Sequence, residues 1–137
     1  MPELPEIAAH AERLDEAYAG TDLAAFRALT FTALKTYAPA PDEAVGTALT
    51  GVGHRGKHLL LRFPTVAFAG VWGVAGDPDD QEPLAHLGPD ADALDAAGLD
   101  AVLDGRSMRI HGLLRDQSIV AGIGRRLANE ICHRARI

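Results

Sequence analysis

Hydrophobic residues near the start of the chain recur at intervals of three and four positions. This spacing runs through Leu4, Ile7, Ala8, Ala11, Leu14 and Tyr18. It predicts an amphipathic helix over residues 4–18. Pro5 suits the first helical turn, where its missing N–H needs no partner, and Gly20 suits the end of the helix.

The segments that follow have the residues typical of strands. Residues 22–37 are rich in Phe, Thr, Leu and Tyr, and predict one or two strands. Glycines at positions 51, 53 and 56 predict a turn. This turn leads into residues 58–63, which predict a buried strand.

Helical spacing returns in the second half of the chain. Residues 94–103 predict short helical pieces, and residues 108–115 predict a helix that is broken by Asp116-Gln117-Ser118. Gly122-Ile123-Gly124 then opens a last helix that runs through Ala135. The pattern therefore predicts an α+β fold, with a leading helix, a β-rich first half and a helical second half.

Composition narrows the class of protein. The 137 residues suffice for one domain or two small ones, and 47% hydrophobic with 23% charged residues excludes a disordered or fibrous chain. No apolar run approaches the ~18 residues that a transmembrane helix needs, and the acidic start does not resemble a signal peptide. Cys132 is the one cysteine, which excludes an internal disulfide. We therefore expect a reducing, cytoplasmic setting.

The net charge of −6 conceals large differences between segments. Residues 1–52 carry −5, residues 53–76 carry +3, residues 77–105 carry −9 and residues 106–137 carry +5. The acidic segment also contains prolines and glycines, as surface linkers do. The two basic segments predict a local positive surface that binds phosphate. Charge runs of this kind are also common on solvated surfaces, so charge alone leaves both interpretations open.

The opening residues Met1-Pro2-Glu3-Leu4-Pro5-Glu6 carry candidate chemistry. Removal of Met1 leaves Pro2 with a secondary amine, and an α-amino group titrates near ~8, so part of it is unprotonated at neutral pH. Its attack on an aldehydic carbon gives an iminium ion, which promotes β-elimination. Glu3 is the neighbouring candidate for a general acid or base. Glutamates in a first helical turn also occur for purely structural reasons.

Three motifs, in this order, resemble the formamidopyrimidine-DNA glycosylase and endonuclease VIII family of DNA repair enzymes. They are the opening six residues, the hairpin His54-Arg55-Gly56-Lys57-His58-Leu59-Leu60-Leu61, and the segment from Leu113 through Gly122-Ile123-Gly124 to Ile131. The last segment is similar to the family's helix–two-turn–helix DNA-binding motif. Residues 84–90 are similar to the connector that precedes it.

The resemblance implies an N-terminal β-sandwich domain with a leading helix (residues 1–87), a linker (88–105) and a helical DNA-binding segment (106–137). It also implies a DNA glycosylase and AP lyase that flips an oxidised base out of damaged double-stranded DNA. Pro2 then attacks C1′ of the deoxyribose to form a Schiff base, with Glu3 as acid/base partner. Elimination (β/δ) cleaves the strand.

Further roles follow from the matched positions. Lys57 matches the hairpin lysine that contacts DNA near the lesion, and Glu6 matches a glutamate near the active centre, whose role here is either catalytic or capping. The expected DNA-binding residues are Arg55, Lys57, Gly122, Gly124, Arg125 and Arg126, with backbone N–H groups of the glycine turn holding a phosphate. The family has an asparagine where this chain has Arg125, which changes that contact. We expect a monomer that acts on nucleoid DNA without a membrane or a bound metal.

Family chains are longer than this one. Residues 64–76 stand where the family carries more strands, and the family's C-terminal zinc finger is absent from this chain, so zinc is implied only for a complete protein that has such a finger. The chain is either a shortened form or a set of joined segments, which would show a break near residues 64–71. We favour joined segments, because a sandwich that lacks strands exposes open edges.

One other function fits the same motifs. A non-catalytic DNA-binding protein or fragment would use the helix–two-turn–helix motif without any chemistry at Pro2. The Pro2-Glu3 pair favours the enzyme, because a binding module has no need of it. The sequence leaves open whether oxidised purines or oxidised pyrimidines are preferred.

Overall fold

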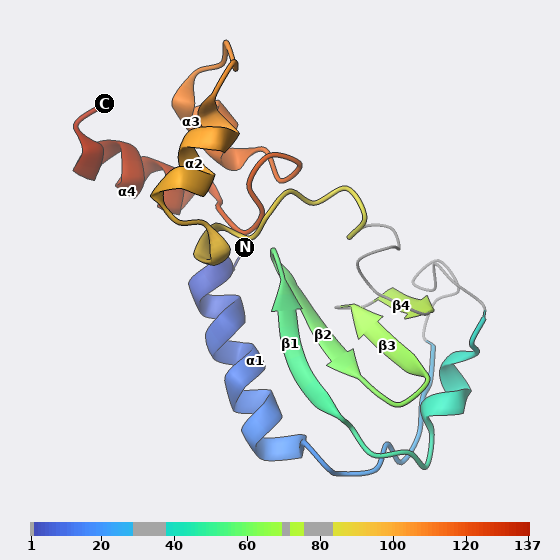
Figure 1. Cartoon of the computed structure of the whole chain (residues 1–137). Coiled ribbons are helices and arrows are strands. Elements are labelled where there is room, and N and C mark those ends of the chain that lie inside the picture. The colour runs from blue at the N-terminus through green and yellow to red at the C-terminus, as the bar shows by residue number, and fades with distance from the viewer. Residues whose placement is uncertain (1, 29–37, 70–71, 76–83) are drawn as a thin grey trace.

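The computed structural model describes residues 2–28, 38–69, 72–75 and 84–137. A long helix, a small antiparallel sheet and a group of short helices follow one another along the chain (Figure 1). The elements are α1 (Leu4–Tyr18), η2 (Pro41–Ala44), β1 (Gly51–Arg55), β2 (His58–Arg62), β3 (Val66–Ala69), β4 (Trp72–Ala75), η4 (Ala91–Ala93), α2 (Ala96–Leu103), α3 (Ile110–Arg115) and α4 (Arg125–Ala135).

Helix α1 confirms the prediction for residues 4–18. Its apolar face buries Leu4, Ile7 and Ala11, and it lies beside β1 (Figure 1). The carboxylate of Asp15 accepts a hydrogen bond of 2.7 Å from the backbone N–H of Val52. This contact satisfies a donor on the outer edge of β1, which no strand pairs in the described sheet.

The four strands form one sheet in the order β1-β2-β3-β4, and every neighbouring pair is antiparallel. The predicted strand over 58–63 is confirmed as β2. The predicted turn at three glycines is wrong at two of them, because Gly51 and Gly53 lie within β1. The turn is made at Gly56, whose φ of +56° favours glycine.

The β2–β3 connection is continuous. The backbone N–H of Phe63 donates to the carbonyl of Val66 at 2.8 Å, and Leu60 pairs with Ala69. The break expected near residues 64–71 is therefore not found between Phe63 and Ala69.

The one or two strands predicted over residues 22–37 are not found in the described part of that segment. Asp22 and Leu23 make only isolated bridges, to Ala48 and Val45, and residues 29–37 lie outside the described residues. Phe26 stacks on Phe68 of β3 with ring centroids 5.3 Å apart. The described residues thus contain one sheet, and the second layer of a sandwich stays a prediction.

The second half of the described chain is helical, as predicted. Its core consists of Leu113, Leu114, Ile119, Val120, Ile123 and Ala128. Leu94, Val102 and Leu103 pack against this core from residues 88–105, the predicted linker. That part of the linker therefore belongs to the packed helical unit. The division into 1–87, 88–105 and 106–137 is otherwise a prediction.

Candidate active site

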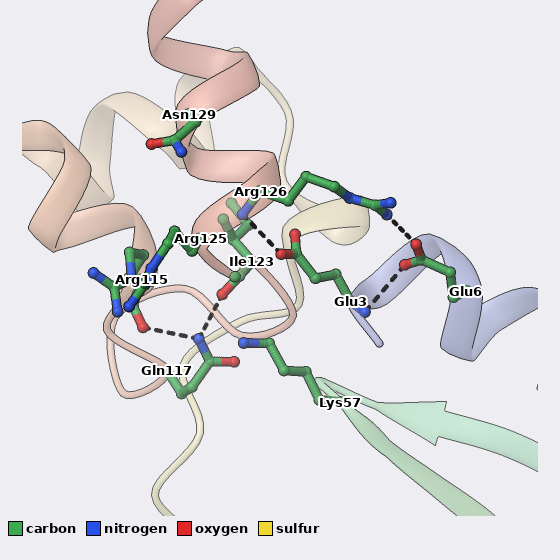
Figure 2. Close-up of a pocket in the computed structure, with 10 residues that line it drawn as sticks. Glu3, Glu6, Lys57, Arg115, Gln117, Ile123, Arg125, Arg126 and Asn129 are labelled. Atoms are coloured by element: carbon green, nitrogen blue, oxygen red, sulfur yellow. Dashed lines mark hydrogen bonds and ion pairs between the residues drawn. The ribbon is translucent and has the colours of Figure 1, made fainter. Parts of the chain in front are cut away.

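A pocket of about 750 Å³ lies where the start of α1, the β1–β2 turn and the start of α4 meet. Figure 2 shows the Arg126 side chain directed towards Glu6, and Lys57 extending from the β1–β2 turn. It is lined by Glu3, Glu6, Lys57, Arg115, Gln117, Ile123, Gly124, Arg125, Arg126 and Asn129. The N-terminal segment and the helical second half of the chain thus share one site.

Glu3 is buried, with 6% of its surface exposed, at the base of helix α4. Its carboxylate accepts hydrogen bonds of 2.9 Å from the backbone N–H groups of Arg126 and Leu127. These are N–H groups of the first helical turn, which have no partner within the helix. Glu3 therefore caps a helix that lies more than a hundred residues away along the chain.

Two glycines allow this close approach. A Cβ at Gly124 would lie 2.5 Å from the Glu3 carboxylate, and a Cβ at Gly122 would lie 2.9 Å from the Leu4 side chain. Gly122 has a φ of +98°, and its carbonyl accepts from the Leu4 N–H at 3.0 Å. The glycine turn is thus shaped to receive the N-terminal segment.

Glu6 closes the first turn of α1. One carboxylate oxygen accepts from the Glu3 N–H at 3.0 Å, which makes a capping box, and the other pairs with the Arg126 guanidinium. The Glu3 N–H and, to a smaller extent, Arg126 hold the pKa of Glu6 below its ordinary value of 4.5. Glu6 therefore stays ionised at neutral pH. The structure supports the capping role, and a catalytic role is untested.

Lys57 reaches the same pocket from the β1–β2 turn (Figure 2). Partial burial lowers the pKa of Lys57, the nearby Glu3 carboxylate raises it, and the nearby Arg115 lowers it. The net result is a pKa below the ordinary 10.5. A cation that has lost some of its water is well placed to bind an anion that enters the pocket.

Gln117 braces the glycine turn. Its amide nitrogen donates to the carbonyls of Ile123 (2.8 Å) and Arg115 (2.9 Å), and its oxygen accepts from the Gly122 N–H (3.0 Å). Phosphate binding by N–H groups of this turn stays a prediction, and several of the nearby N–H groups already have partners within the protein. The Gly122 N–H is bound by Gln117, and the Arg126 and Leu127 N–H groups are bound by Glu3.

The guanidinium of Arg55 makes contacts within the protein, and its predicted contact with DNA stays a prediction. It donates to Asp90 at 2.6 Å and to the carbonyls of Gly88 (2.9 Å) and Leu87 (3.1 Å). The Gly56 N–H also donates to Asp90, at 2.8 Å. Arg55 thus clamps the β1–β2 hairpin to the connector that leads into the helical unit.

The predicted site residues therefore divide into two groups. Glu3, Glu6, Lys57, Gly124, Arg125 and Arg126 line one pocket. Pro2 is exposed immediately before Glu3, Gly122 supports the wall, and Arg55 acts outside the pocket. The pocket is also lined by Arg115, Gln117 and Asn129, for which the sequence pattern predicts no individual role. Asn129 is held by His111 at 2.8 Å.

The residues present do not fit a zinc site of the kind the family implies. The chain has one cysteine, and the described ranges contain no group of three His, Cys, Asp or Glu side chains that could hold a metal ion. None of the helices in those ranges is long and apolar enough to cross a bilayer.

Solved structures share this fold. The MutM (Fpg) protein from Thermus thermophilus matches with a TM-score of 0.82 at 24% sequence identity, over 99% of this chain and 65% of that chain. Lactococcus lactis formamidopyrimidine-DNA glycosylase, non-covalently bound to DNA that contains an AP site, matches with a TM-score of 0.79 at 17% identity, over 99% and 70% of the two chains. These matches define an Fpg-like fold with a small sheet and a helical unit.

Sequence comparison identifies the family. Residues 1–90 match the model of the formamidopyrimidine-DNA glycosylase N-terminal domain, and the chain belongs to the formamidopyrimidine-DNA glycosylase family. This confirms the resemblance seen in the sequence. The formamidopyrimidine-DNA glycosylase of Syntrophotalea carbinolica is 37% identical over 101 residues, which cover 72% of this chain and 35% of the relative.

The chain is short beside its relatives. It covers 35% of the Syntrophotalea carbinolica protein and 24% of the Halorhodospira halophila protein, which is 41% identical over 64 residues. The Methylococcus capsulatus protein aligns with the whole chain at 27% identity, over 184 positions. That alignment exceeds the 137 residues here, so the relative carries additional residues within the aligned region.

Proposed function

We propose that this protein is a base-excision-repair DNA glycosylase with AP-lyase activity, which attacks deoxyribose C1′ through the amine of Pro2. The observation that carries the proposal is the position of Glu3. Its carboxylate is buried in a pocket with Lys57 and three arginines, directly after an exposed Pro2. Family membership supports the same reaction class.

The proposed chemistry begins once Met1 has been removed. The Pro2 nitrogen attacks C1′ of a flipped-out nucleotide and displaces the damaged base, while Glu3 exchanges the proton that the sugar or base requires. The C1′–O4′ bond of the sugar ring then breaks, O4′ leaves with a proton that Glu3 donates, and the nitrogen lone pair forms a C1′=N double bond, which gives a cationic iminium. This cation withdraws electrons from the sugar, which allows loss of a proton from C2′ and departure of the 3′-phosphate by β-elimination.

The cations around the pocket fit the DNA backbone. Lys57, Arg115 and Arg125 line the pocket, and the described contacts give none of them a carboxylate partner within ion-pair distance. We propose that they bind phosphates on either side of the lesion in damaged double-stranded DNA. The solved Lactococcus lactis complex holds a protein of the same fold bound to AP-site DNA. Such binding weakens steeply as salt rises.

Borohydride trapping tests the proposal directly. Incubation with a duplex that carries one abasic site, in the presence of borohydride, is expected to give a covalent protein–DNA adduct. Pro2→Gly replaces the secondary amine with a primary one of different basicity and geometry, and we expect it to lower the trapping rate about a hundredfold. Glu12→Gln changes an exposed residue of α1 outside the pocket and serves as the matched control.

A non-catalytic DNA-binding protein is the other candidate. It would use the basic side chains that line the pocket, Lys57, Arg115 and Arg125, without any chemistry at Pro2. A binding module would shift DNA in a mobility assay. Neither the wild type nor the Pro2→Gly variant would then form an adduct with abasic-site DNA. That result would contradict the enzyme and leave only the positive surface to explain. The preference between oxidised purines and oxidised pyrimidines is tested by base release from duplexes that carry one or the other. The cytoplasm is the proposed location.

A further inference from the structure

Arg126 is bound to the N-terminal segment through both its backbone and its side chain. Its N–H donates to the Glu3 carboxylate at 2.9 Å, and its guanidinium pairs with Glu6. Glu6 in turn accepts from the Glu3 N–H at 3.0 Å. Figure 2 shows these contacts forming a closed ring of three residues. The sequence predicts that Arg126 contacts DNA, yet in the structure Arg126 faces the start of the chain.

We propose that Arg126 is a positioning residue for Pro2, acting through Glu6, rather than a DNA contact. We call the Arg126–Glu6 ion pair the latch. This inference rests on the proposed function, because positioning Pro2 has a chemical purpose only if its amine reacts. The residue concerned, Arg126, lies in the first turn of α4.

The covalent geometry explains how the latch reaches the amine. The Glu3 nitrogen and the Pro2 Cα belong to one planar peptide unit. A Glu6 carboxylate that holds the Glu3 N–H therefore fixes the plane in which the Pro2 Cα lies. One torsion, ψ of Pro2, then sets the direction of the amine. Terminal residues are otherwise poorly ordered, so an anchor at this point limits the positions that the nucleophile samples.

The latch residues are exposed to solvent, so the latch should affect the position of Pro2 more than the stability of the fold. The Arg126 side chain is 70% exposed and the Glu6 side chain 37% exposed. Ion pairs this exposed contribute little to the free energy of folding. Small displacements of a reacting group, by contrast, cost much in rate. Loss of the latch should therefore slow the reaction while the folded state persists.

Neighbouring arginines provide matched controls. Arg125 lines the same pocket, but the described contacts show no carboxylate paired with it. Arg134 lies on the same helix and forms an exposed ion pair with Glu130 at 2.6 Å, outside the pocket. Arg134→Ala thus removes a similar ion pair without touching the N-terminal segment.

Single-turnover trapping on abasic-site DNA separates rate from affinity. Arg126→Ala is expected to lower the maximal trapping rate about tenfold while the half-saturating protein concentration changes less than about twofold. Arg126→Lys keeps a cation and should recover part of the rate. Arg125→Ala is expected to raise the half-saturating concentration, and Arg134→Ala to change neither quantity. A raised half-saturating concentration at full maximal rate in Arg126→Ala would make Arg126 a DNA contact and overturn the proposal.

A double-mutant cycle and an exchange measurement complete the test. Glu6→Gln keeps an acceptor for the Glu3 N–H but removes the charge that pairs with Arg126. The double variant Glu6→Gln with Arg126→Ala should therefore have a maximal trapping rate no lower than that of the slower single variant. Additive losses would overturn the latch. Amide hydrogen exchange at Glu3 in DNA-free protein should accelerate in Arg126→Ala and stay unchanged in Arg134→Ala. This readout decides the inference even if wild-type protein gives no adduct, a result that contradicts the proposed function instead.

Discussion

Replacing Glu3 with glutamine is expected to slow base release by about a hundredfold to ten-thousandfold, the usual contribution of a general acid or base. Glutamine has nearly the same shape but cannot exchange a proton. It also offers one acceptor oxygen where the carboxylate now accepts from two N–H groups, those of Arg126 and Leu127. We therefore also expect the free energy of unfolding to fall by about 1–2 kcal/mol.

Single-turnover assays on duplexes with an oxidised purine or an oxidised pyrimidine measure the rate, and urea unfolding measures the stability. Glu12→Gln, at an exposed position of the same helix, is the matched control and should leave both quantities unchanged. A Glu3→Gln variant that is destabilised yet releases bases at the wild-type rate would restrict Glu3 to its structural role as a cap.

Gly88→Ala is expected to reduce the free energy of unfolding by about 3 kcal/mol. A Cβ at this position would lie 2.5 Å from the carbonyl oxygen of Ile119 and 2.8 Å from that of Ser118. Both are backbone atoms, so relief requires the chain itself to move. The Gly88 carbonyl also accepts from Arg55, and its N–H donates to the Gln117 carbonyl at 2.9 Å. The substitution should therefore separate the hairpin clamp from the loop before α4.

Gly112→Ala provides the comparison. Gly112 lies in helix α3, and nothing lies within 4 Å of a Cβ built there. Alanine at a helical position favours folding by up to about 1 kcal/mol relative to glycine. Urea unfolding of the two variants should give shifts of opposite sign. Equal stability of Gly88→Ala and wild type would mean that the connector and the loop are not held in the contact described.

Local sequence patterns predicted the elements well where burial follows a regular spacing. Helices α1 and α4 begin and end close to the predicted positions, because each has a marked apolar stripe and a recognisable end. The prediction of a turn from the glycines was wrong at β1. Gly51 and Gly53 have no turn to make there, and only the φ of Gly56 shows which glycine the hairpin needs.

The site was harder to derive because its contacts span the chain. The sequence predicts Pro2, Glu3 and Lys57 as site residues from their chemistry and from their resemblance to the family motifs. The bond from the Arg126 N–H to Glu3 joins residues 123 positions apart, and no local pattern predicts such a contact. The contacts of Arg55 and Gln117 are equally hard to predict. A polar side chain that binds backbone groups cannot be distinguished in the sequence from one that faces solvent. The break in the helix at residues 116–118 was the one available signal for Gln117.

The chemistry assigned to this chain depends on which nitrogen bonds to the sugar. Reduction of the abasic-site complex with borohydride, followed by proteolysis and mass spectrometry of the cross-linked peptide, locates that bond. We predict the sugar remnant on the N-terminal peptide, at Pro2, with Met1 removed. A remnant on Lys57, or a chain that retains Met1 and still forms the adduct, would contradict the account.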